Sequence, residues 1–230
     1  MSFMGAVTYR IGRRVLMGPV LYVFGRPKIV GRRHIPRRGA VIVAANHLAV
    51  IDSFYLILAA RREVYFLAKS DYFTRAGLVG RLQKRFFTAM GQISVERAGG
   101  AAATPAIAAA TSIVRDGNVW GIHPEGTRSP DGRLYRGRTG VMRVAMDTGV
   151  PVIPVAITGT RPVHGIRWWR RTRVVIEVLP PLDLTPFAAT NDYRGATDAL
   201  MELLRARTRQ EYVDGYARSW AEPSTGRDAA

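Results

Sequence analysis

A continuous apolar run at residues 41–45, Val-Ile-Val-Ala-Ala, constrains the fold of this 230-residue chain more than any other stretch. An unbroken run of this length is typical of a strand buried on both faces, as in a parallel sheet covered by helices. The run ends in Asn46-His47, and Asp52 follows five residues after His47. Because we expect a helix over 53–60, the histidine should lie at the exit of a buried strand and the carboxylate at the start of the next helix.

Strands and helices alternate along the rest of the chain. Apolar or alternating runs predict strands at 64–68, 91–97, 119–122, 151–158 and 174–179, and an outer strand at most within the basic linker 27–38. Helices are predicted at 101–116, at 139–147 and from Asn191 onward, where the buried side is marked by Leu200, Leu203 and Leu204. This alternation predicts an α/β fold, a single domain with a mostly parallel central sheet flanked by helices, plus an N-terminal amphipathic helical segment.

The chain divides by composition into three expected parts: a basic amphipathic membrane-association segment at 1–30, the main domain at 31–221 and a disordered polar tail at 222–230. In the first part, an apolar stripe at helical spacing is flanked by Arg10, Arg13 and Arg14. Such a helix can lie in a membrane interface, and a helix packed on the domain's own core fits the same periodicity. The longest uncharged run there, 15–25, is shorter than the roughly 20 apolar residues that span a bilayer.

The chain is strongly basic, with 34 Lys and Arg against 17 Asp and Glu and a net charge of +17. The first acidic residue is Asp52. This excess points to a polyanionic partner, which is a nucleic acid, an anionic lipid surface or a phosphorylated substrate, or else it serves solubility alone. The absence of cysteine excludes thiolate catalysis and disulfides and fits a reducing compartment.

Three predicted loops follow strands: the His47 loop, the approach to Arg97, and 125–128 (Glu-Gly-Thr-Arg). Ligands bind in the crevice at the carboxyl ends of parallel strands, so these loops should meet there. Asp52 would fix the tautomer of His47, which would then remove a proton from a hydroxyl, while arginine would bind a phosphate. On the His47 loop alone, a hydrogen-bonded turn with a helix cap is an equal alternative.

Four stretches together resemble the motifs of the glycerophospholipid acyltransferases, the 1-acylglycerol-3-phosphate acyltransferase (PlsC-like) family. Residues 46–52 resemble the N-H-x4-D signature, 91–97 resemble G-x-I-F-I-x-R, 124–129 match P-E-G-T-R-S, and 150–155 are similar to the fourth motif. They occur in the family's order within residues 40–158. Two departures are Ser94 in place of an aromatic residue and His123 in place of a phenylalanine, for which we expect a polar wall residue rather than a second base or a metal ligand.

The resemblance implies transfer of an acyl chain from acyl-CoA or acyl carrier protein to a hydroxyl of a glycerophosphate acceptor. The family's default acceptor is 1-acylglycerol-3-phosphate, which yields phosphatidic acid in phospholipid biosynthesis; glycerol-3-phosphate, another lysophospholipid or a glycolipid remain alternatives. His47 would be the general base and Asp52 its partner. The implied acceptor and phosphate site comprises Arg97, Glu125, Gly126, Thr127, Arg128, Lys69 and Arg138. Arg138 and Gly140 compete with Arg136 and Gly137 for the positions after the third motif, and Lys69 is equally well a surface lysine.

The remaining expectations concern partners. No metal or other cofactor is expected, because a thioester is already activated. Trp168 and Trp169 lie among arginines, which suits contact with an anionic membrane surface or, alternatively, coverage of a sheet edge. The expected location is the cytoplasmic face of the plasma membrane, as a peripheral protein. Nucleic-acid binding is not expected, because the basic surface lacks interleaved aromatic residues and known binding signatures.

Overall fold

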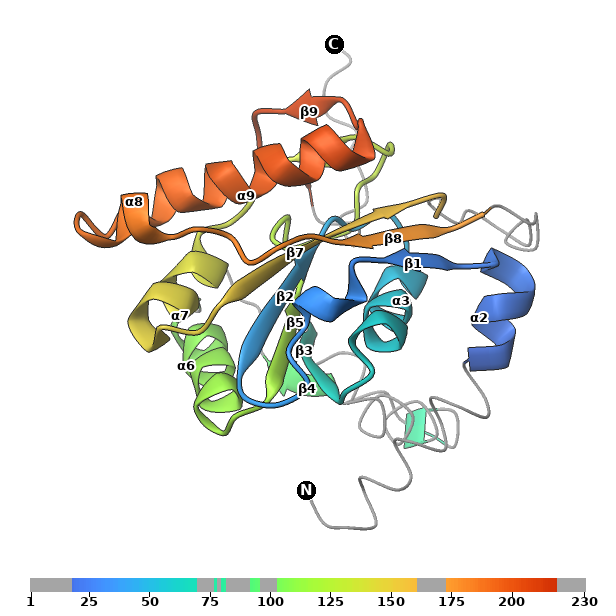
Figure 1. Cartoon of the computed structure of the whole chain (residues 1–230), viewed down its shortest axis with the longest axis horizontal. Coiled ribbons are helices and arrows are strands. Elements are labelled where there is room, and N and C mark those ends of the chain that lie inside the picture. Colours follow the sequence, from blue (N-terminus) through green and yellow to red (C-terminus); the bar gives the residue numbers. More distant parts are fainter. Residues whose placement is uncertain are drawn as a thin grey trace.

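The computed structural model describes residues 18–69, 80–81, 92–95, 103–160 and 173–218, together with residue 77. Within these residues, seven strands form one sheet in the order β1-β8-β7-β2-β5-β3-β4 (Figure 1). Their bounds are β1 Lys28–Val30, β2 Val41–Ala45, β3 Val64–Lys69, β4 Gln92–Val95, β5 Val119–Ile122, β7 Val152–Thr158 and β8 Val175–Val178. A second, two-stranded sheet pairs β6 Leu134–Tyr135 with β9 Tyr212–Val213.

The pairing confirms the predicted α/β architecture. In the described part of the sheet, β7 and β8 pair antiparallel, and the other neighbouring strands pair parallel. The strand at 28–30 lies at the outer edge beside β8, as expected for a basic linker with at most an outer strand. All five residues of β2 are buried, and they contribute alternately to the cores on the two faces of the sheet, which explains the continuous apolar run.

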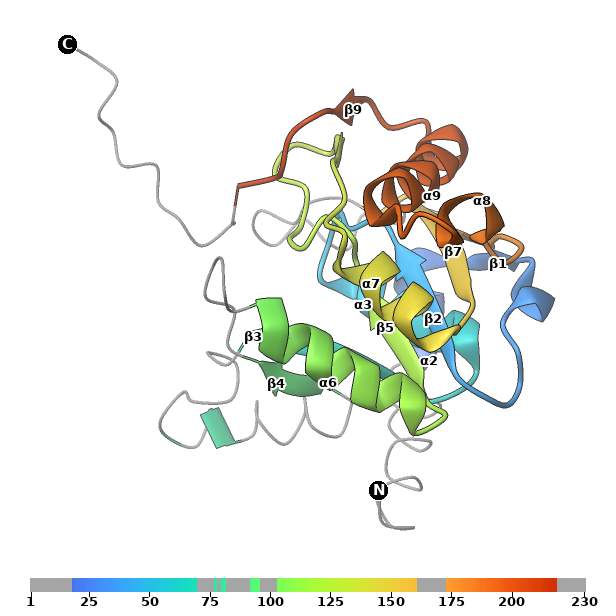
Figure 2. The ribbon, with the colours of Figure 1, turned by 90° about the vertical axis from the view of Figure 1, so that its left-hand side faces the viewer.

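Helices cover both faces of the sheet (Figures 1 and 2). Their bounds are α2 Gly18–Gly25, α3 Ile51–Ala60, α6 Ala103–Arg115, α7 Gly140–Thr148, α8 Thr185–Ala188 and α9 Tyr193–Thr208, with a 3-10 turn η2 at Arg32–His34. Alternate residues of β2 belong to two separate hydrophobic cores, because successive side chains of a strand point to opposite faces of the sheet. Val41 and Val43 join the core under α2 and α3, and Ile42 joins the core under α6, α7 and α9.

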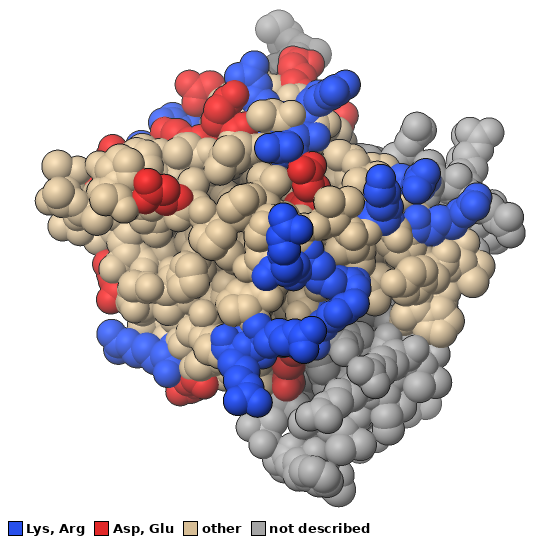
Figure 3. All heavy atoms as spheres, in the orientation of Figure 1, with Lys and Arg blue, Asp and Glu red and all other residues tan. Residues whose placement is uncertain are grey.

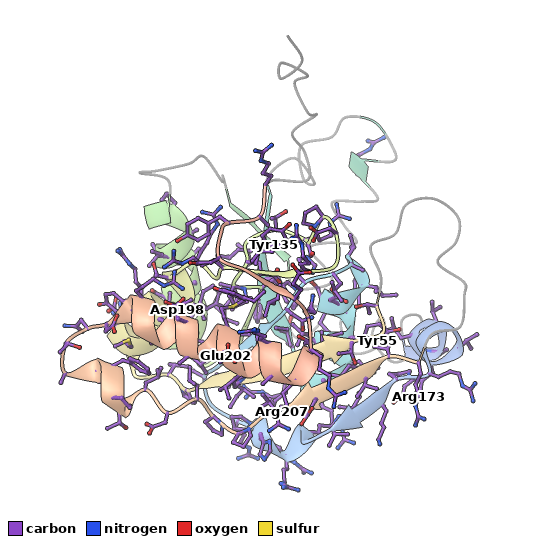
Figure 4. The ribbon with its side chains drawn as sticks, turned by 90° about the horizontal axis from the view of Figure 1, so that it is seen from above. Tyr55, Tyr135, Arg173, Asp198, Glu202 and Arg207 are labelled. Atoms are coloured by element: carbon purple, nitrogen blue, oxygen red, sulfur yellow. The ribbon has the colours of Figure 1, made fainter. Side chains whose placement is uncertain are left out.

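The C-terminal helix corrects one detail of the sequence analysis. Leu200 and Leu204 of α9 are fully buried, but Leu203 is 38% exposed and so lies on the outer side. The buried stripe is completed instead by Met201, 1% exposed. The helix is also tied to the sheet by Arg207, whose guanidinium donates to Glu177 of β8 at 3.1 Å (Figure 4).

The N-terminal apolar segment is described only from residue 18 onward. There it forms α2, which buries Leu21 and leaves Val20, Tyr22 and Val23 about half exposed. No helix among the described residues combines the length and apolar character needed to cross a bilayer. The predictions for residues 1–17, including Arg10, Arg13 and Arg14, and for the tail at 222–230 fall outside the described residues, and the proposed domain limits stay a prediction.

A close approach between two strands explains the glycine in the middle of β5. A Cβ atom at Gly121 would lie 2.7 Å from Val64 Cγ1 and would overlap the ring of Phe66, both on β3. We expect Gly121→Ala to lower the free energy of unfolding by about 1–3 kcal/mol, because overpacking must displace the Phe66 ring. Chemical denaturation would measure this. Gly140→Ala is the matched control, since nothing lies within 4 Å of its Cβ position; equal stability of the two variants would contradict this account of the strand contact.

Candidate active site at the carboxyl ends of β2 and β5

The parallel register of two central strands brings their following loops together. Ala44 of β2 pairs with Ile122 of β5, so Asn46-His47 and His123 leave the sheet at the same edge. Asn46 is fully buried, and its side chain continues the hydrogen bonding between β2 and β7. Its Nδ2 donates to Ile157 O at 2.9 Å, and its Oδ1 accepts from Ile157 N at 2.8 Å. The amide side chain thus anchors the point at which the His47 loop begins.

The predicted histidine and carboxylate are in contact. Nδ1 of His47 lies 3.2 Å from Oδ2 of Asp52. The same oxygen accepts from the backbone N–H of Leu48 at 2.6 Å and of Ala49 at 2.7 Å. Because Oδ2 acts as an acceptor toward these amides, the proton between it and His47 belongs to Nδ1. The loop is therefore a hydrogen-bonded turn, which was one of the two interpretations of the His47 loop. The same turn also fixes the imidazole tautomer.

Asp52 is placed by the early start of α3. The helix begins at Ile51 rather than at Ser53, so the carboxylate lies in its first turn. The side chain is fully buried. Burial raises the pKa of Asp52, and the backbone N–H groups of Ala49 and Leu48 act to lower it. The carboxylate is therefore shielded from water, and the two backbone amides fix its position beside the imidazole.

Glu125 joins the loop after β5 to the His47 loop. Its Oε1 accepts from His47 N at 2.9 Å, and its Oε2 accepts from Tyr135 N in β6 at 3.1 Å; Figure 4 labels Tyr135. A second link runs from Ser129 N to His47 O at 2.8 Å. Glu125 is fully buried, and both of its carboxyl oxygens hold the loops, so its predicted place at the acceptor site stays a prediction.

The other residues of the third motif leave room for an arginine. Gly126 has φ of +78°, and a Cβ there would lie 2.9 Å from Nε of Arg138. The Arg138 guanidinium also lies over the Tyr216 ring, 4.9 Å from its centroid. Arg136 instead faces Asp214 at 3.5 Å. The structure therefore brings Arg138, rather than its competitor Arg136, to this loop, where Thr127 and Arg128 are half-buried.

Several predicted site residues fall outside the described part of the chain. Arg97, Trp168 and Trp169 lie there, and of Lys69 only the backbone, at the end of β3, is described. Their roles stay predictions. Among the described residues, no group of three or more potential metal ligands gathers at one place.

The principal feature that sequence reasoning missed is the environment of His123. Its ring lies parallel to that of His47, with centroids 3.8 Å apart and an interplanar angle of 7°. The sequence showed two histidines that each follow a buried strand, which was a signal of a shared site. The pairing of those strands, however, cannot be read from residue order.

The central strand of the α/β sheet ends in a histidine that contacts a buried carboxylate, and hydrogen bonds join its loop to the Glu-Gly-Thr-Arg loop. A histidine oriented in this way can accept a proton from a hydroxyl. Residues 26–158 match the family model described as Acyltransferase. The chain belongs to the acyltransferase family, as its motifs indicated.

Named relatives agree with this assignment. The 1-acyl-sn-glycerol-3-phosphate acyltransferase of Limnanthes douglasii is 30% identical over 173 residues, which cover 74% of this chain and 59% of the relative. The Mus musculus alpha enzyme of the same name is 26% identical over 88% of this chain and 70% of the relative. The crystal structure of PlsC, the 1-acyl-sn-glycerophosphate (LPA) acyltransferase from Thermotoga maritima, matches with a TM-score of 0.62 and 24% identity, over 89% of this chain and 78% of that one, which shows the shared fold. The chain spans only 59% of the length of the Limnanthes relatives.

The buried carboxylate of Glu125 predicts a pH-dependent stability. Burial raises the pKa of Glu125 to about 8, against an ordinary value of about 4.3 in an unfolded chain. Between these values the folded protein holds a proton that the unfolded chain has lost. The free energy of unfolding therefore falls as pH rises through this window, by up to about 1.4 kcal/mol per pH unit.

Chemical denaturation of the wild type and of Glu125→Gln from pH 5 to 8.5 measures this contribution. The variant should lack it, so the stability difference between the two proteins should change steadily with pH. Glu202→Gln, which alters an exposed carboxylate on α9, is the control. Parallel curves for the wild type and Glu125→Gln would contradict the assignment.

Proposed function

We propose that this protein transfers a fatty acyl chain from acyl-CoA or acyl carrier protein to a hydroxyl of a glycerophosphate lipid, with 1-acylglycerol-3-phosphate as acceptor and phosphatidic acid as product. The observation that carries the proposal is the contact of His47 Nδ1 with the buried Asp52 carboxylate at the end of β2. Membership of the acyltransferase family and the names of the relatives support the reaction and the acceptor.

The mechanism follows from the tautomer of His47. With the proton on Nδ1, the basic nitrogen is Nε2, which would remove the proton of the acceptor hydroxyl. The oxygen attacks the thioester carbonyl and forms a C–O bond. The resulting tetrahedral intermediate then breaks its C–S bond, and the leaving thiolate takes the proton from the imidazolium. Asp52 stabilises that imidazolium while the charge exists, so no covalent acyl-enzyme is required.

The acceptor phosphate needs fixed positive charge beside the histidine. Arg138 and Arg128 would supply it, because Glu125 attaches their segment to the His47 loop and Arg138 packs against Gly126. Guanidinium groups bind phosphate bidentately, so they would orient the acceptor as well as attract it. Arg97, which follows β4, is the further candidate that the motif assigns to the phosphate.

The acceptor is tested by thiol release from palmitoyl-CoA. The purified protein would be supplied with lysophosphatidate, with glycerol-3-phosphate, with lysophosphatidylcholine or with no acceptor. We expect release that depends on lysophosphatidate. Release with glycerol-3-phosphate alone would instead assign the first acylation step, and no release with any acceptor, from palmitoyl-CoA or from palmitoyl-acyl carrier protein, would overturn the proposal.

Asp52→Asn tests the proposed role of the carboxylate. The variant keeps an oxygen that can accept from the Leu48 and Ala49 amides but loses the charge that stabilises imidazolium. We expect kcat to fall by about 100-fold or more with a small change in KM. The steady-state rate with lysophosphatidate measures this. Asp147→Asn, at an exposed position on α7, is the control, and wild-type kcat in Asp52→Asn would exclude the proposed role.

We further propose that the protein works at an anionic membrane surface. Lys and Arg side chains form a band across the face seen in Figure 3, and α2 presents apolar side chains to solvent. Basic groups attract anionic headgroups, and exposed apolar side chains enter the interface.

We expect the double change of Trp168 and Trp169 to Ala to weaken flotation with anionic vesicles several-fold. The double change to Phe should keep most of the binding; unchanged flotation of the Ala variant would contradict the role of this pair.

A further inference from the structure

The reaction proposed above leaves His123 without a role, yet its position is closely specified. The residue directly follows β5, and its ring is stacked on that of His47 at 3.8 Å. The ring centroid of Phe66, on β3, lies 6.1 Å from that of His123, with an interplanar angle of 18°. Gly121 provides the space for the Phe66 ring. The His123 ring is therefore near one ring from the loop after β2 and one ring from β3.

The contacts of His123 define its tautomer. Nδ1 lies 3.0 Å from Ala45 O and 3.2 Å from Asn46 O. Carbonyl oxygens only accept hydrogen bonds, so Nδ1 carries the proton and donates to them. Nε2 lies 3.0 Å from Oγ of Ser53, on α3, so in the neutral ring it accepts from that hydroxyl. Burial, and then the nearby His47 imidazole, lower the pKa of His123 to about 3, which agrees with a neutral ring.

A neutral ring in this place acts on His47 differently from Asp52. The carboxylate contacts His47 at one ring nitrogen, Nδ1, at 3.2 Å. A flat surface stacked on the ring face opposes tilting of the ring. Its π-electrons also tolerate the positive charge that His47 acquires, whereas a second imidazolium would repel it.

We propose that His123 is a positioning residue for the general base: locked as the Nδ1–H tautomer by the carbonyls of Ala45 and Asn46, it fixes the plane of the His47 ring by stacking. The inference rests on the proposed function, since it assigns how His47 is held for proton transfer. It also gives a reason for histidine in a position where the related motif has phenylalanine. Both rings present a flat face, and histidine adds an attachment to the end of β2.

Ser53 and His123 are also arranged like a nucleophile and its general base. The hydroxyl-to-Nε2 distance of 3.0 Å suits such a pair. A ring this weakly basic, however, would not remove a hydroxyl proton near neutral pH. The low basicity of His123 therefore favours a structural hydrogen bond, and acylation of Ser53 becomes an outcome that the experiment must look for.

The first measurement is NMR of the wild-type protein with 15N-labelled histidine. We expect one ring to show the Nδ1–H tautomer and no titration between pH 5 and 8, and to be identified as His123 by its loss in His123→Phe. A ring that titrates in this range, or that carries its proton on Nε2, overturns the inference. This result does not depend on any acyltransferase activity, so it separates failure of the inference from failure of the proposed function.

The second measurement is steady-state kinetics of two variants. His123→Ala removes the stack, and we expect kcat to fall by about 10- to 100-fold with KM nearly unchanged, as a misoriented base predicts. His123→Phe restores a flat face and should recover kcat to within about threefold of the wild type. Wild-type kcat in His123→Ala, or equal loss in both variants, overturns the stacking role, as does an acylated Ser53 peptide found by mass spectrometry.

A matched control distinguishes positioning from general destabilisation. His34 also contacts a strand carbonyl, Val178 O, at 2.9 Å. The strand that it contacts, β8, is separated from β2 by β7 in the sheet order. We expect His34→Ala to lower stability while leaving kcat unchanged. If His34→Ala lowers kcat as much as His123→Ala does, the effect is structural and the inference fails.

Discussion

One carboxylate oxygen, Oδ2 of Asp52, holds the site together. It accepts from the amides of Leu48 and Ala49 at 2.6 and 2.7 Å and lies 3.2 Å from Nδ1 of His47. The two amides close the turn after β2, so the turn and the orientation of the base depend on the same atom. A side chain with only the catalytic contact could rotate away, whereas this one is fixed by the backbone that it shapes. The chemistry at Nε2 of His47 follows from that constraint.

The site also depends on polar side chains that water does not reach. Asn46, Asp52 and Glu125 are each fully buried at the carboxyl end of the sheet. Removing such groups from water is costly unless backbone groups replace the lost hydrogen bonds. Asn46 pairs with Ile157, and Glu125 bridges His47 and Tyr135. These bonds couple β2, β5, β6 and β7, so that the loops bearing the base and the arginines are set by the sheet itself.

Residue order predicted much of the fold because the signals are local. The buried runs at β2, β5 and β7 and the helices between them follow from apolar patterning, and the contact between His47 and Asp52 follows from a turn of five residues. Strand order is a non-local property, so the stacking of His123 on His47 and the bridge from Glu125 to Tyr135 were not visible. Leu200, Leu203 and Leu204 have the spacing of one helix face, but the buried stripe passes through Met201 and leaves Leu203 38% exposed, which depends on how α9 packs on the sheet.

The central claim is that His47 removes the proton of an acceptor hydroxyl during acyl transfer. The most direct test follows, in one reaction, the thiol released from palmitoyl-CoA and the phosphatidic acid formed from lysophosphatidate, by mass spectrometry, for the wild type and for His47→Ala. The account predicts equal amounts of the two products from the wild type and the loss of both in the variant. Continued formation of phosphatidic acid by a folded His47→Ala protein would contradict it.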